Sequence, residues 1–416
     1  MVAQLSKMKG IIEANREHQR FKDSGSSSYS SSNLQTIRIE MPTNGKLIDF
    51  KNHGLLFDMA GSCDAGAQTN IAFNNYAAST WIREVRFYAG NNQIGKALKR
   101  YNGFCRMNFD LKANDEWASS YGYSEGAKAG SETNTATSIA SRQYIHTFQS
   151  GIASCQDHFP SNKIDALRIE IDMEDANKVI FGTGASPANP VYTIQNVYVL
   201  CDLITLNGPE QTMLDKMVSS KLKINYLEYH SHIETDISGD TVINVGILDG
   251  GLKSSFYFDV LNADRNNQKD YWGFSNRNNL QSYRFKLGER DLSQYEIRVS
   301  STRLSEYLYH LQNAMKASQG ALPFELGNSN VLLTSTRFIV GQRADKNNDH
   351  DTFSSMIDGT RNKLVVDVGF ESSPAASTTY VYSVLDKELE ILPGLQTNNV
   401  NTNELLTERK QDLSNK

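Results

Sequence analysis

Two histidines one residue apart, His230 and His232, are the first candidates for chemistry in this chain of 416 residues. On a β-strand both imidazoles would project from the same face, a spacing that can hold a metal ion. Glu228 and Glu234 share that parity, but no further ligand is evident beside the pair. We therefore expect structural or solvent-facing histidines here rather than a metal site.

The acidic run Asp345–Asp351, DKNNDHD, imitates the start of a calcium-binding loop. Such a loop needs glycine at its sixth place for a sharp turn and glutamate at its twelfth place for bidentate ligation. The run lacks that glycine and has Met356 at the twelfth place, and Asp264–Gln268 fails the same test. Loose cation binding between subunits is left as the lesser alternative.

Sequence signatures of catalysis are missing. The chain contains no G-x-S-x-G, no G-x-x-x-x-G-K-[ST] and no H-E-x-x-H motif. Gly182-Thr183-Gly184 is better interpreted as a hairpin turn than as a phosphate cradle. The many Asp and Glu residues leave a carboxylate pair for glycoside cleavage open. We predict no catalytic, cofactor-binding or metal-binding residues, and no enzyme.

Hydrophobic periodicity indicates a mostly β chain. Leu167–Met173 alternates apolar with charged residues, and Thr36–Met41 does the same, as half-buried strands do. Further strands are predicted at residues 143–149, 192–206, 221–229, 241–248, 254–261, 282–287, 331–340, 363–370 and 378–391. Many short strands separated by polar turns favour antiparallel β-sandwiches over βαβ units.

Helices are predicted at few places. Leu304–Met315 has a full apolar stripe, whereas Ala97–Cys105 has a weaker one that Gly103 interrupts. A third helix follows Pro209, which suits a first helical turn because it lacks an N–H group. The apolar face of this third helix would consist of Met213, Leu214 and Met217.

Residues 1–34 indicate an amphipathic arm on a flexible tether. Leu5, Met8 and Ile12 recur at helical spacing within residues 3–21, and a Ser/Gly-rich linker follows at residues 24–32. Residues 1–22 carry five basic and two acidic side chains, a net charge of +3. A frayed terminus is the alternative to an arm that orders against a partner. Residues 393–416 are predicted to form a loosely held polar tail.

Bulk composition narrows the class of protein. No apolar run approaches the roughly 20 residues of a membrane-spanning helix, so we expect a soluble protein. The formal net charge of −5 provides no global attraction to nucleic acid. The four cysteines lie far apart without a C-x-x-C pair, which favours reduced, buried thiols over disulfides. They are Cys63, Cys105, Cys155 and Cys201.

The order of elements repeats along the chain. Trp81–Asp110 predicts a strand, a turn at Gly90-Asn91-Asn92, a second strand and a short helix, and a similar shape returns at Ser282–Lys316. Val197–Leu206 and Val381–Leu392 each look like the last strand of a unit that a Pro/Gly stop ends. Few positions are identical, so the repeat lies in the order of elements rather than in the residues.

This repeat predicts two units, residues 35–208 and 221–392, joined by a linking helix over residues 209–220. Each unit has the length of one eight-stranded sandwich with insertions. The predicted fold is therefore all-β, with a short helix after the hairpin in the middle of each sandwich.

Such a chain resembles the double jelly-roll major capsid proteins of the adenovirus-like, tectivirus-like, virophage and Polinton-like viruses. The resemblance covers about residues 35–392. In the first half Ser79–Phe109 carries it, with the aromatic–Asn pair Tyr101-Asn102 on the helix. The other segments that carry it are Tyr283–Gly288, Leu304–Met315 and Asn207-Gly208-Pro209-Glu210.

The resemblance implies two tandem eight-stranded jelly rolls in a structural major capsid protein. Three copies would form a pseudo-hexameric capsomer of an icosahedral shell, assembled inside the host cell and located in the virion. The implied partners are further copies in the homotrimer, neighbouring capsomers, and penton, minor capsid or cement proteins. Residues 1–22 would clamp neighbouring capsomers, with an inner membrane or the genome as the next alternatives. The resemblance implies no small-molecule substrate.

Several aromatic residues then become contact candidates. Tyr101, Asn102 and Phe104 would lie where a helix braces one sandwich against its neighbour. Tyr121-Gly122-Tyr123 and Tyr271-Trp272-Gly273-Phe274 would contact neighbouring subunits or cap a core edge. The alternative hypotheses are a two-sandwich carbohydrate-binding or adhesive spike protein and a sandwich-fold glycosidase or lyase. Neither requires a repeated unit with a linking helix and a tethered arm.

Overall fold

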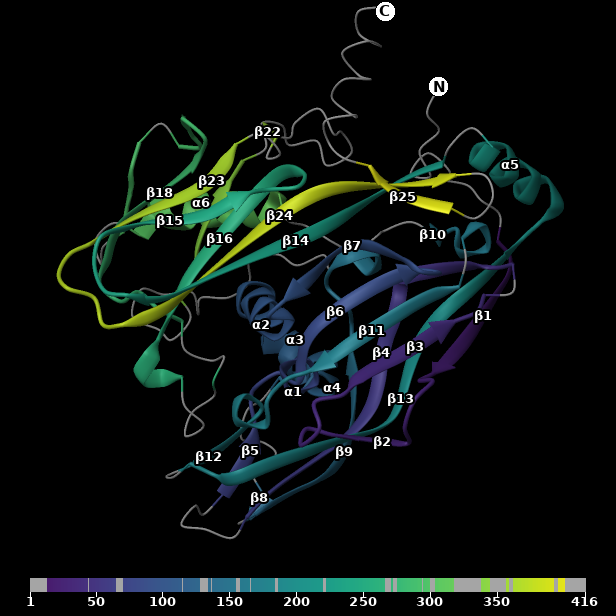
Figure 1. Cartoon of the computed structure of the whole chain (residues 1–416), viewed down its shortest axis with the longest axis horizontal. Coiled ribbons are helices and arrows are strands. Elements are labelled where there is room, and N and C mark those ends of the chain that lie inside the picture. The colour runs from purple at the N-terminus through teal and green to yellow at the C-terminus, as the bar shows by residue number, and fades with distance from the viewer. Residues whose placement is uncertain are drawn as a thin grey trace, which may run out of the picture.

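A computed structural model of the chain shows two β-sandwiches joined along one side (Figure 1). It describes residues 13–43, 45–64, 70–113, 115–127, 134–135, 137–154, 158–164, 166–183, 186–219, 222–265, 271, 275–293, 295–299, 304–317, 338–344, 357–358, 362–392 and 396–400. Every strand pairing in it is antiparallel. The prediction of an all-β fold built from antiparallel sandwiches is confirmed.

The larger sheet of the first sandwich is built around the long strand β13, which pairs with β1, β2 and β4. The order β1-β13-β4-β10 forms its larger sheet, in which β2 also pairs with β13 and β9 with β4. The facing sheet has the order β3-β11-β6-β7, and a small sheet has the order β12-β5-β8. The strands are β1 (Glu13–Lys22), β2 (Ser28–Ser30), β3 (Thr36–Met41), β4 (Leu47–Asp64), β5 (Asn70–Phe73), β6 (Ile82–Ala89), β7 (Asn92–Lys99), β8 (Asn134–Thr135), β9 (Ser138–His146), β10 (His158–Phe159), β11 (Leu167–Met173), β12 (Ile180–Thr183) and β13 (Ala188–Leu206).

The second sandwich repeats this plan. Its larger sheet has the order β14-β24-β16-β17, with β21 and β22 also paired to β16 and β25 to β24. Its smaller sheet has the order β15-β23-β18-β19, with β20 paired to β18. The strands are β14 (Leu222–Ile237), β15 (Thr241–Ile247), β16 (Gly251–Leu261), β17 (Ser275–Asn276), β18 (Leu280–Leu287), β19 (Arg290–Asp291), β20 (Ile297–Arg298), β21 (Val340–Arg343), β22 (Ile357–Asp358), β23 (Lys363–Phe370), β24 (Ser377–Leu392) and β25 (Gln396–Val400).

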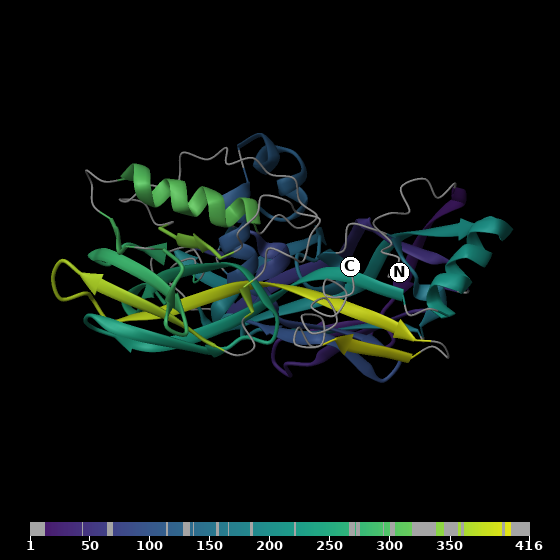
Figure 2. The same cartoon turned by 90° about the horizontal axis from the view of Figure 1, so that it is seen from above.

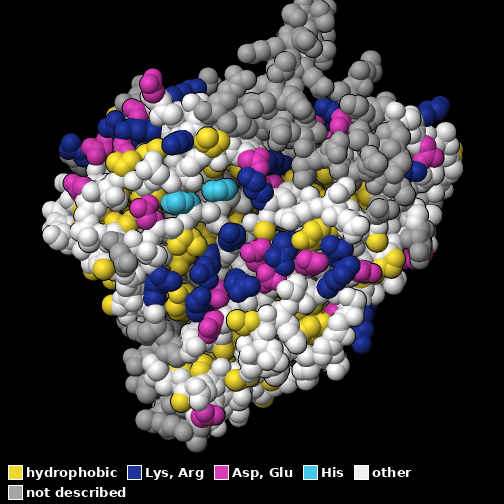
Figure 3. All heavy atoms as spheres, viewed as in Figure 1, with side chains coloured by type: hydrophobic (Ala, Val, Ile, Leu, Met, Phe, Trp, Pro, Cys, Tyr) yellow, Lys and Arg dark blue, Asp and Glu magenta, His cyan; other side chains and the backbone are white. Residues whose placement is uncertain are grey.

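Apolar residues that alternate with polar ones along the strands form the cores of the two sandwiches. On β3, Ile37, Ile39 and Met41 are fully buried while the residues between them are exposed. Charged side chains of β3, β6 and β11 cover the outer face of that sheet, where Arg86 bonds to Asp172 at 2.8 Å. Figure 3 shows this face as a band of mixed positive and negative side chains. Period-two patterning thus separates a dry interior from a charged surface.

Six short helices complete the described fold. They are α1 (Ala77–Thr80), α2 (Tyr101–Lys112), α3 (Asp115–Ser119), α4 (Tyr121–Ser124), α5 (Gly208–Ser219) and α6 (Leu304–Ala317). The α2 helix lies where the sandwiches meet (Figure 1), and α6 lies on the outer side of the second sandwich (Figure 2). None of the described helices combines the length and apolar character needed to cross a bilayer.

Two helix predictions need correction. The helix expected over Ala97–Cys105 begins only at Tyr101, because β7 continues to Lys99 and Arg100 then turns the chain with a left-handed φ of 57°. The linking helix α5 matches its prediction in position, and Leu214 and Met217 of its expected apolar face pack against the core. Met213 does not, since it is 52% exposed, and Val218 is buried instead.

The helical arm is wrong for the part of the N-terminal segment that the structure describes. From Glu13 to Lys22 the chain forms β1, which pairs with β13 residues 198–206. The Ser-rich segment is not a free linker either, since β2 pairs with β13 residues 193–195. The ladder that β13 offers at its edge outweighs the weak helical pattern, and Phe21 is buried there. Leu5, Met8 and Ile12 lie outside the described residues.

Part of the expected C-terminal tail is also a strand. Residues 396–400 form β25, which pairs with the end of β24. The predicted strand at residues 331–340 is described only from residue 338 onward, and β21 begins there at Val340. The first large sheet therefore gains β1 and β2, and the second gains β25, from segments expected to be an arm, a linker or a tail.

Candidate functional site at the joint between the sandwiches

An aromatic cluster centred on Phe104 joins the two sandwiches. Phe104 lies on α2 and is fully buried, with its ring centroid 4.2 Å from that of Tyr229 on β14 and 5.6 Å from that of Tyr382 on β24. The Tyr382 hydroxyl also donates to the backbone carbonyl of Arg100 at 3.0 Å. Phe104 is thus an interface residue between the sandwiches, as predicted for this helix.

Tyr101 and Asn102 point into the first sandwich instead. The Tyr101 hydroxyl accepts from the Gln149 N–H at 3.0 Å and lies 2.9 Å from His146 Nε2, so its own proton faces that nitrogen. His146 Nδ1 then donates to Glu125 Oε2 at 2.8 Å. These bonds satisfy buried polar groups on α2, β9 and the turn after α4, and they fix the rotation of the helix.

Cys105 lies beside this chain of bonds, with Sγ 4.0 Å from His146 Nε2. Cysteine, histidine and glutamate in this order could form a nucleophile, its base and an orienting acid. Burial raises the pKa of the Cys105 thiol well above its ordinary value, so the sulfur stays protonated. Cys105, His146 and Glu125 are each at most 1% exposed, so no substrate reaches them. The set is structural.

A polar seam flanks the aromatic cluster. Lys96 on β7 bonds to Asp249 at 2.8 Å, and Lys387 of β24 bonds to the same carboxylate. Burial acts to raise the pKa of Asp249, but the bonds from these two lysines outweigh it and lower that pKa. Burial raises the pKa of the neighbouring Glu228, which lies against Gly95 of β7.

Gly95 makes this close approach feasible. A Cβ atom at residue 95 would lie 2.7 Å from Glu228 Oε2, and its φ of +71° disfavours other residues. The first sandwich therefore approaches the second through a glycine, an arrangement that the sequence did not single out.

The two histidines of the sequence-based metal candidate lie on β14 beside the seam. Burial lowers the pKa of His230, and the nearby Lys96 lowers it further. His232 Nε2 lies 3.7 Å from Glu234 Oε2. Among the residues that the structure describes, no group of three or more His, Cys, Asp or Glu side chains is placed to hold a metal ion. Asp345–Asp351 lies outside the described residues.

The remaining sequence candidates have separate surroundings. Tyr121 and Tyr123 are 45% and 57% exposed, and the Arg142 guanidinium lies 3.9 Å from the Tyr123 ring centroid. Tyr271 is buried against Arg265, while residues 272–274 lie outside the described part. Gly182 lies on β12 and pairs with Ile71 of β5. Cys105 and Cys201 are buried free thiols, Cys63 is half-buried on β4, and Cys155 is not among the described residues.

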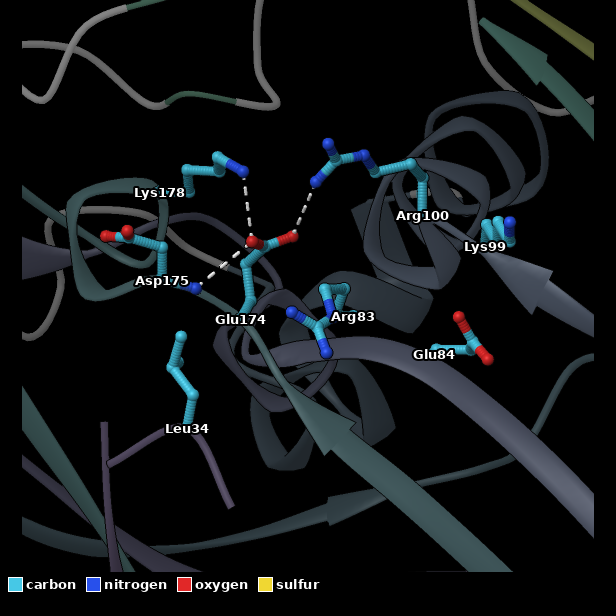
Figure 4. Close-up of a pocket in the computed structure, with 8 residues that line it drawn as sticks. All are labelled: Leu34, Arg83, Glu84, Lys99, Arg100, Glu174, Asp175 and Lys178. Carbon is cyan, nitrogen blue, oxygen red and sulfur yellow. Dashed lines mark hydrogen bonds and ion pairs between the residues drawn. The ribbon is translucent and has the colours of Figure 1, made fainter. Parts of the chain in front are cut away.

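A pocket of about 390 Å³ opens near the first turn of α2. Glu174 lies at its centre and is 2% exposed. Lys178 and Arg100 bond to its two oxygens at 3.0 and 3.3 Å, and Arg83 points toward the same centre (Figure 4). Sequence analysis did not identify these residues, because Arg100 and Glu174 stand far apart in the chain.

Comparison with known proteins identifies the fold. No protein-family model matches the sequence, and no curated protein matches it. The structure has the double jelly-roll fold found in viral major capsid proteins, with TM-scores of 0.61 and 0.63 to the neighbours named next.

VP54 of PBCV-1 is 12% identical, with 95% of this chain and 99% of VP54 covered, at a TM-score of 0.61. The Faustovirus major capsid protein is 8% identical over 92% of this chain and 91% of its own, at 0.63. A chain of the Sputnik virophage structure is 9% identical over 94% and 89%, again at 0.61. At these identities the likeness establishes the fold.

Proposed function

We propose that this chain is the major capsid protein of an icosahedral virus, in which three copies form a pseudo-hexameric capsomer. The observation that carries the proposal is the pair of jelly rolls joined through a buried aromatic cluster, aligned over 92–95% of the chain with the capsid proteins VP54 and Faustovirus major capsid protein. The role is structural and non-catalytic.

The geometry suits this role for a physical reason. Three chains with two sandwiches each supply six similar walls, so a threefold ring can occupy a site of sixfold outline. Such a ring needs a heterologous interface that closes after three copies. It also needs a fixed angle between the two sandwiches of one chain, and the cluster around Phe104 with the Lys96–Asp249 seam supports one.

The proposed location is the virion, after assembly inside the host cell. The proposed partners are further copies, neighbouring capsomers, and penton, minor capsid or cement proteins. A clamp on neighbouring capsomers, with an inner membrane or the genome as alternatives, was expected for residues 1–22. Because β1 occupies Glu13–Lys22, we now assign that contact to residues 1–12, which carry Lys7 and Lys9. We further propose that the sandwiches are two folding units joined by α5.

Light scattering after gel filtration tests the assembly. We expect a particle of three times the 46.5 kDa chain mass, and triangular or hexagonal outlines in negative-stain micrographs. A stable monomer at micromolar concentration contradicts the proposal. A monomer that also binds an immobilised glycan array would favour the carbohydrate-binding or adhesive alternative instead.

A further inference from the structure

The carboxylates of the pocket near α2 are already saturated with donors. Oε1 of Glu174 accepts from Lys178 at 3.0 Å and from the Asp175 N–H at 3.1 Å. Oε2 accepts from Arg100 at 3.3 Å and from the Asn102 side chain at 3.0 Å. Four donors on one buried carboxylate leave it little capacity for a further cation.

The other two acids of the pocket wall are also engaged. Glu84 bonds to Arg86 at 3.0 Å, on the charged face of the sheet. Oδ1 of Asp175 accepts from the backbone N–H of Asn177 at 2.8 Å and from its side chain at 3.0 Å, which forms the local turn. Both carboxylates therefore have hydrogen-bond partners of their own.

The basic side chains, in contrast, retain free donors. A guanidinium has five N–H groups, and Arg100 uses one of them in its bond to Glu174. Arg83 makes one long contact with Asp172, at 3.5 Å, while Asp172 keeps its shorter bonds to Arg86. Lys99 also lines the pocket and forms no ion pair within the described part of the chain. The pocket is therefore a donor-rich site with an unmatched positive charge.

A second hollow, which no basic side chain lines, adjoins this pocket. This hollow of about 280 Å³ shares Leu34 and Asp175 with the pocket. The walls of this hollow include Ser31, Ser32, Asn177, Asn189 and Pro190. Leu34 is 44% exposed, which gives the shared wall an apolar surface. Together the two hollows form an elongated groove whose basic side chains all lie at one end.

We propose that this groove binds an extended segment of another polypeptide and places one acidic side chain of that segment among Arg83, Lys99 and Arg100. Four basic and three acidic residues line the basic end, so its excess of one positive charge matches a single carboxylate. A free phosphate would occupy that end alone and leave the second hollow unfilled. An extended peptide fills both, and arginine is well suited to carboxylates because it donates two parallel bonds.

Fluorescence anisotropy at low ionic strength tests the groove directly. The ligand is a fluorescein-labelled peptide of alternating Glu and Thr, and its reference is the same peptide with Gln in place of each Glu. We expect the full-length protein to bind the acidic peptide more tightly. Arg83→Gln and Lys99→Gln should each weaken binding by about threefold, and the double variant by about tenfold, as for partly exposed ion pairs.

Lys216→Gln is the matched control, since it removes the same charge from an exposed residue of α5 that does not line the groove. Equal binding of the two peptides, or an equal loss in Lys216→Gln, would overturn the proposal. Tighter binding of a single-stranded oligonucleotide, with the same dependence on Arg83 and Lys99, would assign the groove to nucleic acid and overturn it too. Inorganic phosphate that binds with that dependence while the acidic peptide does not would reduce the groove to a free-anion site. None of these outcomes depends on whether the chain is trimeric.

Discussion

The same element serves two purposes in the two sandwiches. In each, a hairpin precedes a helix of three to four turns, α2 after β6 and β7 and α6 after β18 and β19. Residues 101–111 of α2 are all buried, and Phe104 contacts the second sandwich. The α6 helix buries Tyr307 and Leu311 against its own sandwich and leaves Tyr309 63% exposed. The helix at this repeated position therefore joins the two sandwiches in the case of α2 and only covers its own sandwich in the case of α6.

Replacing one buried side chain on each helix by alanine should distinguish the joining role of α2 from the covering role of α6. Phe104→Ala and Leu311→Ala each remove a fully buried side chain, so we expect each to lower the free energy of unfolding by about 3–5 kcal/mol. Phe104→Ala should also split the calorimetric melt into two transitions, because it weakens the coupling between the sandwiches. A single transition in Phe104→Ala, or a split melt in Leu311→Ala, would contradict the distinction.

The two sandwiches should also respond to acid with opposite sign. Burial raises the pKa of Asp259 in the second sandwich from 3.8 to about 6, against the opposing bonds from Thr379 and Tyr257. Because this folded pKa is the higher one, its contribution to stability is complete below about pH 4 and is lost as pH rises through 6. The loss is at most about 3 kcal/mol.

In the first sandwich the pKa of Asp172 is lowered. Burial alone would raise it, but the hydrogen bond from Thr36 and the charges of Arg86 and Arg83 outweigh burial. Its contribution is present above the ordinary pKa of 3.8 and is lost as pH falls through the folded value. Urea unfolding at several pH values should show that Asp259→Asn becomes less harmful as pH rises from 4 to 7. Asp172→Asn should become less harmful as pH falls below 4, and the same slope in both variants would refute the contrast.

The N-terminal strand holds the first sandwich through ion pairs, whereas β25, QTNNV, contains no charged residue. Arg16 of β1 bonds to Asp49 at 2.9 Å and to Asp202 at 3.0 Å, two carboxylates whose side chains are at most 3% exposed. Arg16→Gln leaves both carboxylates without this cation, so we expect a loss of about 2 kcal/mol in unfolding free energy. Arg20→Gln on the same strand is the control. An equal loss of unfolding free energy in that variant would mean that the ion pairs of Arg16 do not specifically hold β1 in place.

The smallest effect is expected on the outer face of α6. Tyr309→Ala should change the free energy of unfolding by less than about 0.5 kcal/mol, because the side chain is mostly in solvent. A larger loss in an assembled sample than in a dissociated one would show that Tyr309 lies at a subunit contact.

Sequence patterns predicted the elements that have one buried face. Leu167–Met173 and residues 363–370 alternate cleanly and became β11 and β23. The 18-residue strand β4 escaped, because most of its residues are buried on both faces and its sequence does not alternate. β1 was missed for the opposite reason, since Phe21 is buried in this edge strand while Arg20 and Lys22 beside it are exposed.

The joint was predictable only in part. The helix containing Phe104 has an apolar pattern, and the repeat of elements suggested that it braces two sandwiches. The residues that form the other contacts at this joint show no pattern in the sequence that would predict them. Lys96 meets Asp249, and Tyr382 meets Arg100, across separations along the chain that leave no spacing to read. Such contacts follow from how the sandwiches are placed, which local patterns do not encode.

The pairing of β1 with β13 has a consequence for the order of events during synthesis. The first strand of the described chain leaves the ribosome long before its partner, residues 198–206, exists. At usual elongation rates the wait is on the order of ten seconds or more. An unpaired apolar strand would aggregate in that interval, but the charged residues Arg16, Glu17 and Arg20 keep this one soluble. The charged residues that made β1 hard to predict as a strand therefore also protect it from aggregation until β13 has been synthesised.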